Sequence, residues 1–263
     1  MVISIIGSDG TILARAEGTS NVRLVYDKAF EHGDVISLST AKDGFVVAQL
    51  EDSIAPVLGF LSGEFKLPIP FGEKRVCYSP KSFTGNVHVL WARHATALEV
   101  ASYRNLALNP LDNHDNTALF PHASANVETR GESVFAAFNA INGNISSSGH
   151  GEWPYESWGI NRRDDAEITI DFGCDANIDK IVITLRADFP HDNWWKEATL
   201  LFSDGSTFTP TLIKSGKPQS FDITPRTVRS VTMKDMIKDE SDPSPFPALV
   251  QLECWGVPAK FSL

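Results

Sequence analysis

The sequence predicts an all-β protein in which a small N-terminal β-sandwich is followed by a second β-sandwich. Short apolar runs with alternating polar positions recur along the chain, and turn residues separate them at regular spacing. The chain has 263 residues, of which 42% are hydrophobic and 21% charged. Such a chain can bury one or two cores, and its length indicates about two domains.

Residues 1–100 are predicted to form the N-terminal all-β domain. The turn residues 8–10 separate two strand-like runs, and Asp43 and Gly44 precede another. Two prolines within 66–71 confine that segment to a sheet edge or a loop. Residues 22–29 fit either a strand or a short helix, because periodicity does not separate the two. The histidines here are isolated, so no catalytic constellation is predicted.

Residues 105–263 are predicted to form the second domain, with residues 97–104 as the connection into it. An Asn- and His-rich stretch follows as far as residue 126. We expect a long ordered loop whose side chains bond to backbone, with a direct ligand role as the alternative. Strands are expected at 166–173, 180–185, 198–202, 220–223, 228–233 and 249–255.

Charge and cysteine content exclude several classes of partner. The net charge is −10, and no run of Lys or Arg is longer than a pair. This argues against nucleic acid and anionic membranes. No apolar stretch approaches the ~20 residues that cross a bilayer, and no signal-peptide pattern opens the chain. The three cysteines are far apart, so free structural thiols are expected rather than disulfides. We expect a cytoplasmic protein.

Two predicted loops are rich in aromatic and polar side chains of the kinds that bind sugars. Residues 186–195 follow one predicted strand and precede another, and residues 145–163 are rich in aromatic side chains. Aromatic rings stack on sugar faces, while fixed polar groups bind hydroxyls. Loops on a rigid β scaffold are common recognition sites. The expected ligand-binding residues are Trp153, Tyr155, Trp158, Asn161, Arg162, Arg186, Asp188, His191, Asp192, Trp194 and Trp195.

Some of these residues have a second interpretation. Four of the six tryptophans lie between positions 153 and 195, yet Trp is also a common core residue, so we expect some to be buried. Trp194 and Trp195 would point to opposite faces of an extended segment, so only one could stack on a given ligand. Arg186 could bind a ligand carboxylate or pair internally with Asp188.

The order of short motifs after residue 105 carries a family resemblance. The motifs are Asn-Ala-Ile-Asn-Gly-Asn at 139–144, Ser-Trp-Gly at 157–159, and the segments 168–173, 178–183, 201–206 and 250–256. Together, over residues 105–257, they resemble a galactose-binding-domain-like, or discoidin, jelly roll. Segments 103–110, 150–155 and 186–195 are also similar to bacterial proteins labelled only as carbohydrate-binding. The resemblance implies non-catalytic, lectin-like carbohydrate binding through loops at one end of the jelly roll.

The same resemblance implies a structural calcium ion beside the site. The matching positions are Asn142, Asn144 and Glu253. Asn142 stands where the family commonly has Asp, which removes one formal charge from a site for a hard cation. The alternative is an Asn-Gly turn held by its own hydrogen bonds.

Two other functions stay open at this point. A metal-dependent polysaccharide lyase or glycoside hydrolase could use His114, His122, His150 and His191 with Asp188 and Asp192. Against it, the sequence has neither zinc-type helical His spacing nor a Gly-x-Ser-x-Gly elbow. A homo-oligomeric interaction protein could use the proline-rich segment 243–247 for contact, although such a segment also serves as a rigid loop.

Overall fold

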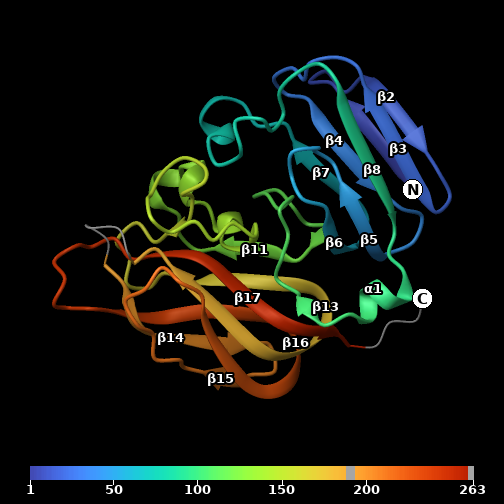
Figure 1. The fold of residues 1–263 in the computed structure, drawn as a ribbon. Coiled ribbons are helices and arrows are strands. Elements are labelled where there is room, and N and C mark those ends of the chain that lie inside the picture. The colour runs from blue at the N-terminus through green and yellow to red at the C-terminus, as the bar shows by residue number, and fades with distance from the viewer. Residues whose placement is uncertain (188–192, 260–263) are drawn as a thin grey trace.

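The computed structural model describes residues 1–187 and 193–259, and nearly all of its regular structure is β (Figure 1). This confirms the predicted all-β class. No helix within the described ranges is long and apolar enough to cross a membrane. In chain order the elements are β1 (Val2–Ile6), β2 (Ile12–Glu17), β3 (Asn21–Tyr26), β4 (Val35–Ser39), β5 (Gly44–Gln49), β6 (Val57–Leu61), β7 (Glu64–Pro68), η1 (Gly72–Arg75), β8 (His88–His94), α1 (Ala97–Ala101), β9 (Arg104–Asn105), β10 (Leu119–Phe120), β11 (His122–Ala125), η2 (Thr129–Gly131), η3 (Ser133–Phe135), η4 (Ala137–Ile141), β12 (Trp158–Gly159), β13 (Ile168–Leu185), β14 (Trp195–Phe202), β15 (Thr207–Phe208), β16 (Gln219–Lys238) and β17 (Ala248–Pro258).

The N-terminal sandwich packs two antiparallel sheets around one core. Their strand orders are β2-β1-β4-β7 and β10-β6-β5-β8-β3, and the inward side chains form a single buried cluster. Burial alternates along β3, so the ambiguous segment 22–29 begins as a strand. The proline-containing β7 lies at the edge of its sheet, as predicted.

The second sheet of this sandwich takes its outermost strand from beyond residue 100. In β10, Leu119 pairs with Leu61 and Phe120 pairs with Phe60. Leu111 and Leu119 are buried in the N-terminal core. The Asn-rich segment therefore packs on the first sandwich before the chain enters the second one, and the boundary at residues 100–105 stays a prediction.

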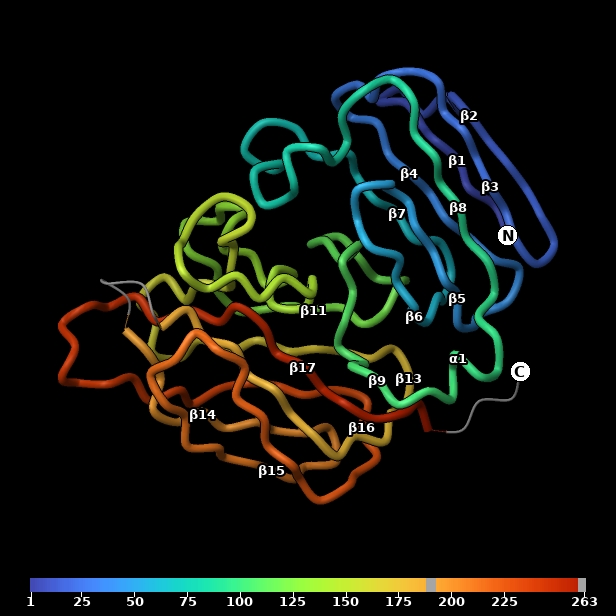
Figure 2. The backbone as a smooth tube through the Cα atoms, in the orientation of Figure 1, coloured from blue at the N-terminus to red at the C-terminus, as the bar shows by residue number. Residues whose placement is uncertain are grey.

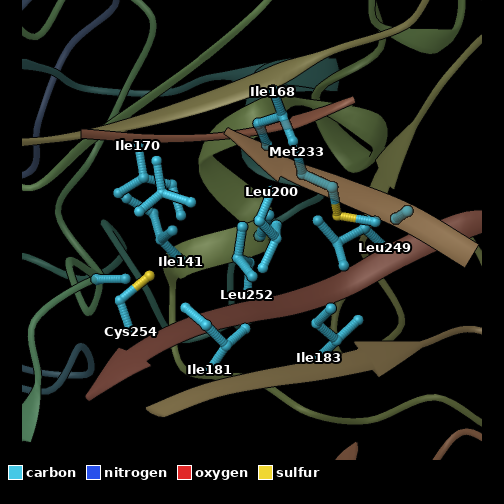
Figure 3. Close-up of a cluster of buried hydrophobic side chains, with 14 of the residues drawn as sticks. Ile141, Ile168, Ile170, Ile181, Ile183, Leu200, Met233, Leu249, Leu252 and Cys254 are labelled. Atoms are coloured by element: carbon cyan, nitrogen blue, oxygen red, sulfur yellow. The ribbon is translucent and has the colours of Figure 1, made fainter. Parts of the chain in front are cut away.

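The C-terminal sandwich is built on long bent strands. The expected strands 166–173 and 180–185 both belong to β13, whose pairing with β16 shifts register between Asp171 and Ala176. Figure 3 shows Ile168 and Ile170 on one side of the core and Ile181 on the other. One continuous strand thus replaces the two expected strands, because a bulge rather than a break lies between them. The expected strands 220–223 and 228–233 are likewise joined in β16.

A glycine permits this bulge. Gly173 has a φ of +71°, and a Cβ at this position would lie 2.3 Å from Cγ of Phe120. Both the backbone conformation and the close approach therefore require a residue without a side chain.

Side-chain amides order the Asn-rich loop, as the sequence predicted. Asn109 donates from Nδ2 to the carbonyl oxygens of Leu119 at 3.0 Å and Pro121 at 2.8 Å. Asn116 accepts from the backbone N–H groups of Ala118 and Leu119 at 3.1 and 2.9 Å. These buried bonds satisfy backbone groups that no strand ladder reaches.

The cysteines are free, as expected. Cys77 and Cys254 are buried and Cys174 is half-buried. Burial raises the pKa of Cys77 to about 12 and that of Cys174 to about 12. The thiolate is the reactive form, so these thiols are inert packing residues.

An ion pair in the Asn-rich loop makes stability depend on pH. His114 Nε2 lies 2.7 Å from Glu128 Oε2, and this bond raises the pKa of His114 although burial opposes it. A group whose pKa is raised on folding contributes its full stabilisation at pH values below its unfolded-state pKa, about 6.5 for His. That stabilisation is lost as the pH rises through the folded-state pKa. We expect the Tm of the unmutated chain to fall by about 1–2 °C between mildly acidic and mildly alkaline pH because this ion pair is lost. His114→Gln should abolish this fall. Thermal melts across pH measure it, and exposed His32→Gln should keep the fall.

Candidate functional site: a cleft between the two sandwiches

A cleft of about 410 Å³ lies where loops of the two sandwiches meet. Its lining comes from residues within 53–55 and 77–82 on one side, and within 109–112, 138–144 and 153–156 on the other. Figure 2 shows these loops between the sandwiches, the first side in blue to teal and the second in green to yellow-green. This volume is typical of small-ligand sites.

Hydrogen bonds between distant segments fix the two walls. The backbone N–H of Trp153 donates to the carbonyl of Val76 at 2.8 Å. Ser133 donates from its N–H to Glu73 Oε1 and from its hydroxyl to the Glu73 carbonyl, both at 2.6 Å. The cleft is therefore held open by contacts that do not need a ligand.

Trp153 supplies an aromatic surface to the cleft. Its side chain is 42% exposed, whereas most tryptophans of the chain are more deeply packed. Phe138 and Tyr78 also line the cleft and stack with ring centroids 6.5 Å apart. An indole with one open face can accept the apolar face of a ring-shaped ligand.

Two buried acceptors in the cleft have no hydrogen-bond partner among the described residues. They are Asn139 Oδ1 and Glu156 Oε2. The residues are 1% and 3% exposed. Leaving such a group unpaired costs about 1–3 kcal/mol, so each one calls for a ligand atom or a bound water.

The rest of both side chains is fixed. Asn139 donates from Nδ2 to the carbonyls of Ser133 at 2.8 Å and Ser157 at 3.3 Å. Glu156 Oε1 accepts from Nδ2 of Asn142 at 3.0 Å and of Asn144 at 2.9 Å. Burial raises the pKa of Glu156, and the amide donors oppose the rise. The free oxygens are thus held in place by their neighbours.

The structure removes two tryptophans from the predicted ligand-binding set. Trp158 is 0% exposed and Trp195 is 1% exposed, and their ring centroids lie 6.4 Å apart in the C-terminal core. Trp158 donates from its indole N–H to the Val127 carbonyl at 2.9 Å. Neither ring can stack on a ligand, because the core covers both faces.

Three other predicted residues meet at a second, smaller cavity of about 140 Å³. Asn161 and Arg162 are exposed there, and the Arg162 guanidinium lies 4.7 Å from the ring centre of Phe246. Arg186 is only 5% exposed and lies 5.9 Å from the ring centre of Phe135. Arg186 is therefore part of the packing beneath this surface.

The remaining predicted residues lie elsewhere. Trp194 is half-buried and lines an open depression together with Lys214, Asp239 and residues 241–246. Tyr155 is 37% exposed and covers Gly149. Asp188, His191 and Asp192 lie outside the described residues. Within the described residues, the loops 145–163 and 186–195 meet at the smaller cavity through Asn161, Arg162 and Arg186, and only Trp153 of the predicted set lines the cleft.

Sequence reasoning missed Glu156, Asn139 and the N-terminal wall. Glu156 was detectable in principle, since it is a single carboxylate inside the aromatic run 153–158. The contribution of Ser53 and Ser82 was not detectable from the sequence. Their hydroxyls lie 2.7 Å apart in the cleft wall. No local pattern reports a contact between domains.

The side-chain oxygens expected to ligate calcium already accept hydrogen bonds from the protein. Asn142 Oδ1 accepts from the Asn144 N–H at 2.7 Å and from Gln251 Nε2 at 3.0 Å. Asn144 Oδ1 accepts from the Ser146 N–H, and Glu253 accepts from the Trp255 indole N–H at 2.6 Å. Calcium needs free oxygens, whereas these face N–H donors. Across the described ranges, no group of three His, Cys, Asp or Glu side chains could hold a metal.

Chelation tests calcium binding directly. We expect excess EDTA or millimolar calcium to change Tm by less than about 1 °C, because Gln251 and the loop amides already satisfy the Asn oxygens. A bound ion at a hundredfold its Kd would add about 2.7 kcal/mol, and Tm would rise by roughly 5–10 °C. Such a rise, reversed by EDTA, would contradict this geometry. Magnesium at the same ionic strength is the control.

The histidines of the enzyme hypothesis do not converge on the cleft. His114 bonds Glu128, and His122 Nδ1 lies 2.9 Å from Asp112 Oδ1. His150 lines the smaller cavity beside Arg162. These three histidines of the enzyme hypothesis therefore lie in separate places, and none of them lines the cleft.

Comparison with known proteins gave structural similarities only. No protein-family model and no curated protein matches the chain. Chitosan-binding module 1 from a Paenibacillus sp. IK-5 chitosanase/glucanase has a TM-score of 0.42 and 20% identity, covering 58% of this chain and 99% of that one. The family 32 carbohydrate-binding module of C. perfringens NanJ, solved in complex with galactose, has a TM-score of 0.39 and 18% identity, and the match covers 51% of this chain and 91% of that one. A Streptococcus pneumoniae fucose-binding module has a TM-score of 0.41 and 14% identity, and the match covers 60% of this chain and 99% of that one. Likeness at this level does not identify the ligand of this chain.

Proposed function

We propose that the chain binds a saccharide, without catalysis, in the cleft between its sandwiches. The observation that carries the proposal is the pairing, in one cavity, of the half-exposed Trp153 with the unpartnered acceptors of Asn139 and Glu156. An open indole and fixed, buried polar atoms are the two features that a sugar ring requires.

Both sandwiches contribute to this site. Ser53, Lys81 and Ser82 line the cleft from the N-terminal side, and Asn139, Asn144 and Glu156 line it from the C-terminal loops. Because hydrogen bonds fix both walls in the free protein, binding would order few side chains, and little affinity would be lost to that ordering.

The carboxylates of the cleft favour binding over hydrolysis. Asp112 and Glu156 are the carboxylates among its described lining residues. Asp112 Oδ1 bonds Asn116 and His122, and its Oδ2 accepts from the Ala123 N–H at 2.8 Å. Glycoside hydrolysis needs two available carboxyl groups, and Asp112 is fully engaged in structure.

A glycan array, with reducing-end product measured on the same samples, tests this function. We expect saturable binding of at least one glycan and no product. Product would establish a hydrolase or lyase instead. An array without any bound glycan would refute saccharide binding, and elution as an oligomer in the same preparation would then favour an interaction protein.

A further inference from the structure

We propose that the saccharide carries a protonated amine, and that Asn139 Oδ1 and Glu156 Oε2 hold this amine. The inference rests on the proposed function and names the class of sugar. It depends on which atoms the cleft leaves unpaired: both are acceptors, and both belong to residues at least nine-tenths buried.

The neighbouring groups identify both of these atoms as oxygens without a hydrogen-bond partner among the described residues. The Asn139 amide is oriented by two carbonyl acceptors, at Ser133 and Ser157, so its nitrogen faces them and its oxygen is the free atom. Glu156 uses Oε1 for the amides of Asn142 and Asn144. Two residues of the cleft lining therefore each carry a buried oxygen that needs a donor.

An ammonium group matches such a surface better than a hydroxyl does. It has three donors and no acceptor, whereas a hydroxyl has one donor and two lone pairs that would face further oxygens. Hydrogen bonds between an ammonium and a carboxylate are also about twice as strong as those between neutral groups.

The surrounding charges support a cation at this place. Glu51, 2% exposed, accepts from the hydroxyl of the lining residue Ser53 at 3.0 Å, although burial raises the pKa of its carboxyl. Its Oε2 likewise has no partner among the described residues. The opposing charge in the lining is Lys81, which is exposed at the rim and can turn its ammonium to solvent. The net charge of −10 adds long-range attraction.

Calorimetric titration of the full chain with three oligosaccharides tests the inference. The probes are β-1,4-linked tetrasaccharides of glucosamine, N-acetylglucosamine and glucose. The titration uses the highest pH at which the sugar amine is still protonated, because burial raises the pKa of Glu156 and lower pH favours its neutral form. We expect the glucosamine tetrasaccharide to bind at least about tenfold more tightly than the other two. Acetylation removes the charge and two donors, while the glucose probe replaces the amine by a hydroxyl.

The Glu156→Gln variant locates the preference. It keeps the size of the side chain and removes its charge, so we expect the glucosamine preference to fall to about twofold or less while weak binding of all three sugars remains. Exposed Glu167→Gln removes the same charge away from the cleft and should leave the preference unchanged. A thermal melt checks folding, and the unmutated comparison stands if the variant does not fold.

The outcomes separate the two proposals. Equal binding of the three sugars, or a preference for a neutral one, overturns the amine and leaves saccharide binding intact; the acceptors would then hold water. A preference that survives Glu156→Gln overturns the assignment to this cleft wall. If other glycans bind on the array but glucosamine does not, the inference fails alone, and if no glycan binds anywhere, the proposed function fails with it.

Discussion

Replacing Trp153 with alanine is expected to weaken saccharide binding by about 30-fold or more and to leave Tm nearly unchanged. Buried aromatic anchors cost about 2 kcal/mol or more when they are truncated at an interface, which corresponds to that factor. Stability should persist because the ring is 42% exposed. The bond from Trp153 to Val76 is made by the backbone N–H, which alanine retains. Calorimetry with a glycan found on the array measures the loss.

Phe246→Ala is the matched control for Trp153→Ala. Phe246 is 36% exposed and lies beneath Arg162 at the smaller cavity, outside the cleft. We expect this variant to bind the glycan as the unmutated chain does. If Phe246→Ala abolishes binding while Trp153→Ala does not, the ligand lies on the Arg162 surface.

Replacing Gln251 with leucine is expected to destabilise the protein by about 3 kcal/mol or more. Gln251 is 1% exposed; it donates to the Asn139 carbonyl at 2.6 Å and to Asn142 Oδ1, and accepts from the Gly143 N–H at 3.0 Å. Leucine would leave the Gly143 N–H without a partner, at about 1–3 kcal/mol. It would also remove one of the two donors from the Asn139 carbonyl and from Asn142 Oδ1, at about 1 kcal/mol for each lost bond. Tm should fall by roughly 6–12 °C. Glycan binding should weaken as well, because Asn142 helps to orient Glu156.

A second glutamine provides the comparison for Gln251→Leu. Gln219 makes a similar pair of hydrogen bonds to the exposed Ile213, with its Oε1 accepting at 2.9 Å and its Nε2 donating at 3.0 Å. Gln219 is only half-buried, at the start of β16. Water can replace these bonds, so Gln219→Leu should cost less than about 1 kcal/mol. Similar losses in the two variants would show that burial of the Gln251 bonds is not what matters.

The sequence predicted the all-β class and the ordered Asn-rich loop because these depend on local patterns. Alternation and turn residues report strands, and the edge position of β7 follows from its prolines. The same local reading divided β13 in two at Gly173, because a bulge and a turn use the same residue types.

The candidate site was less predictable because burial and long-range contact decide it. Trp158 and Trp153 lie five positions apart, yet one is fully buried and the other is open. Their residue type fits both roles. The wall of the cleft joins Trp153 to Val76, and no sequence pattern links positions so far apart. The Asn-Gly turn at Asn142 was one of two open alternatives in the sequence, while its partner Gln251 emerged only from the fold.

A crystal structure of the chain with a glycan selected on the array tests the central claim most directly. The account predicts electron density for a sugar ring against the Trp153 indole, with a donor group within hydrogen-bond distance of Asn139 Oδ1 and Glu156 Oε2. Sugar density at the Arg162–Phe246 surface or beside Trp194, with the cleft holding only water, would contradict it.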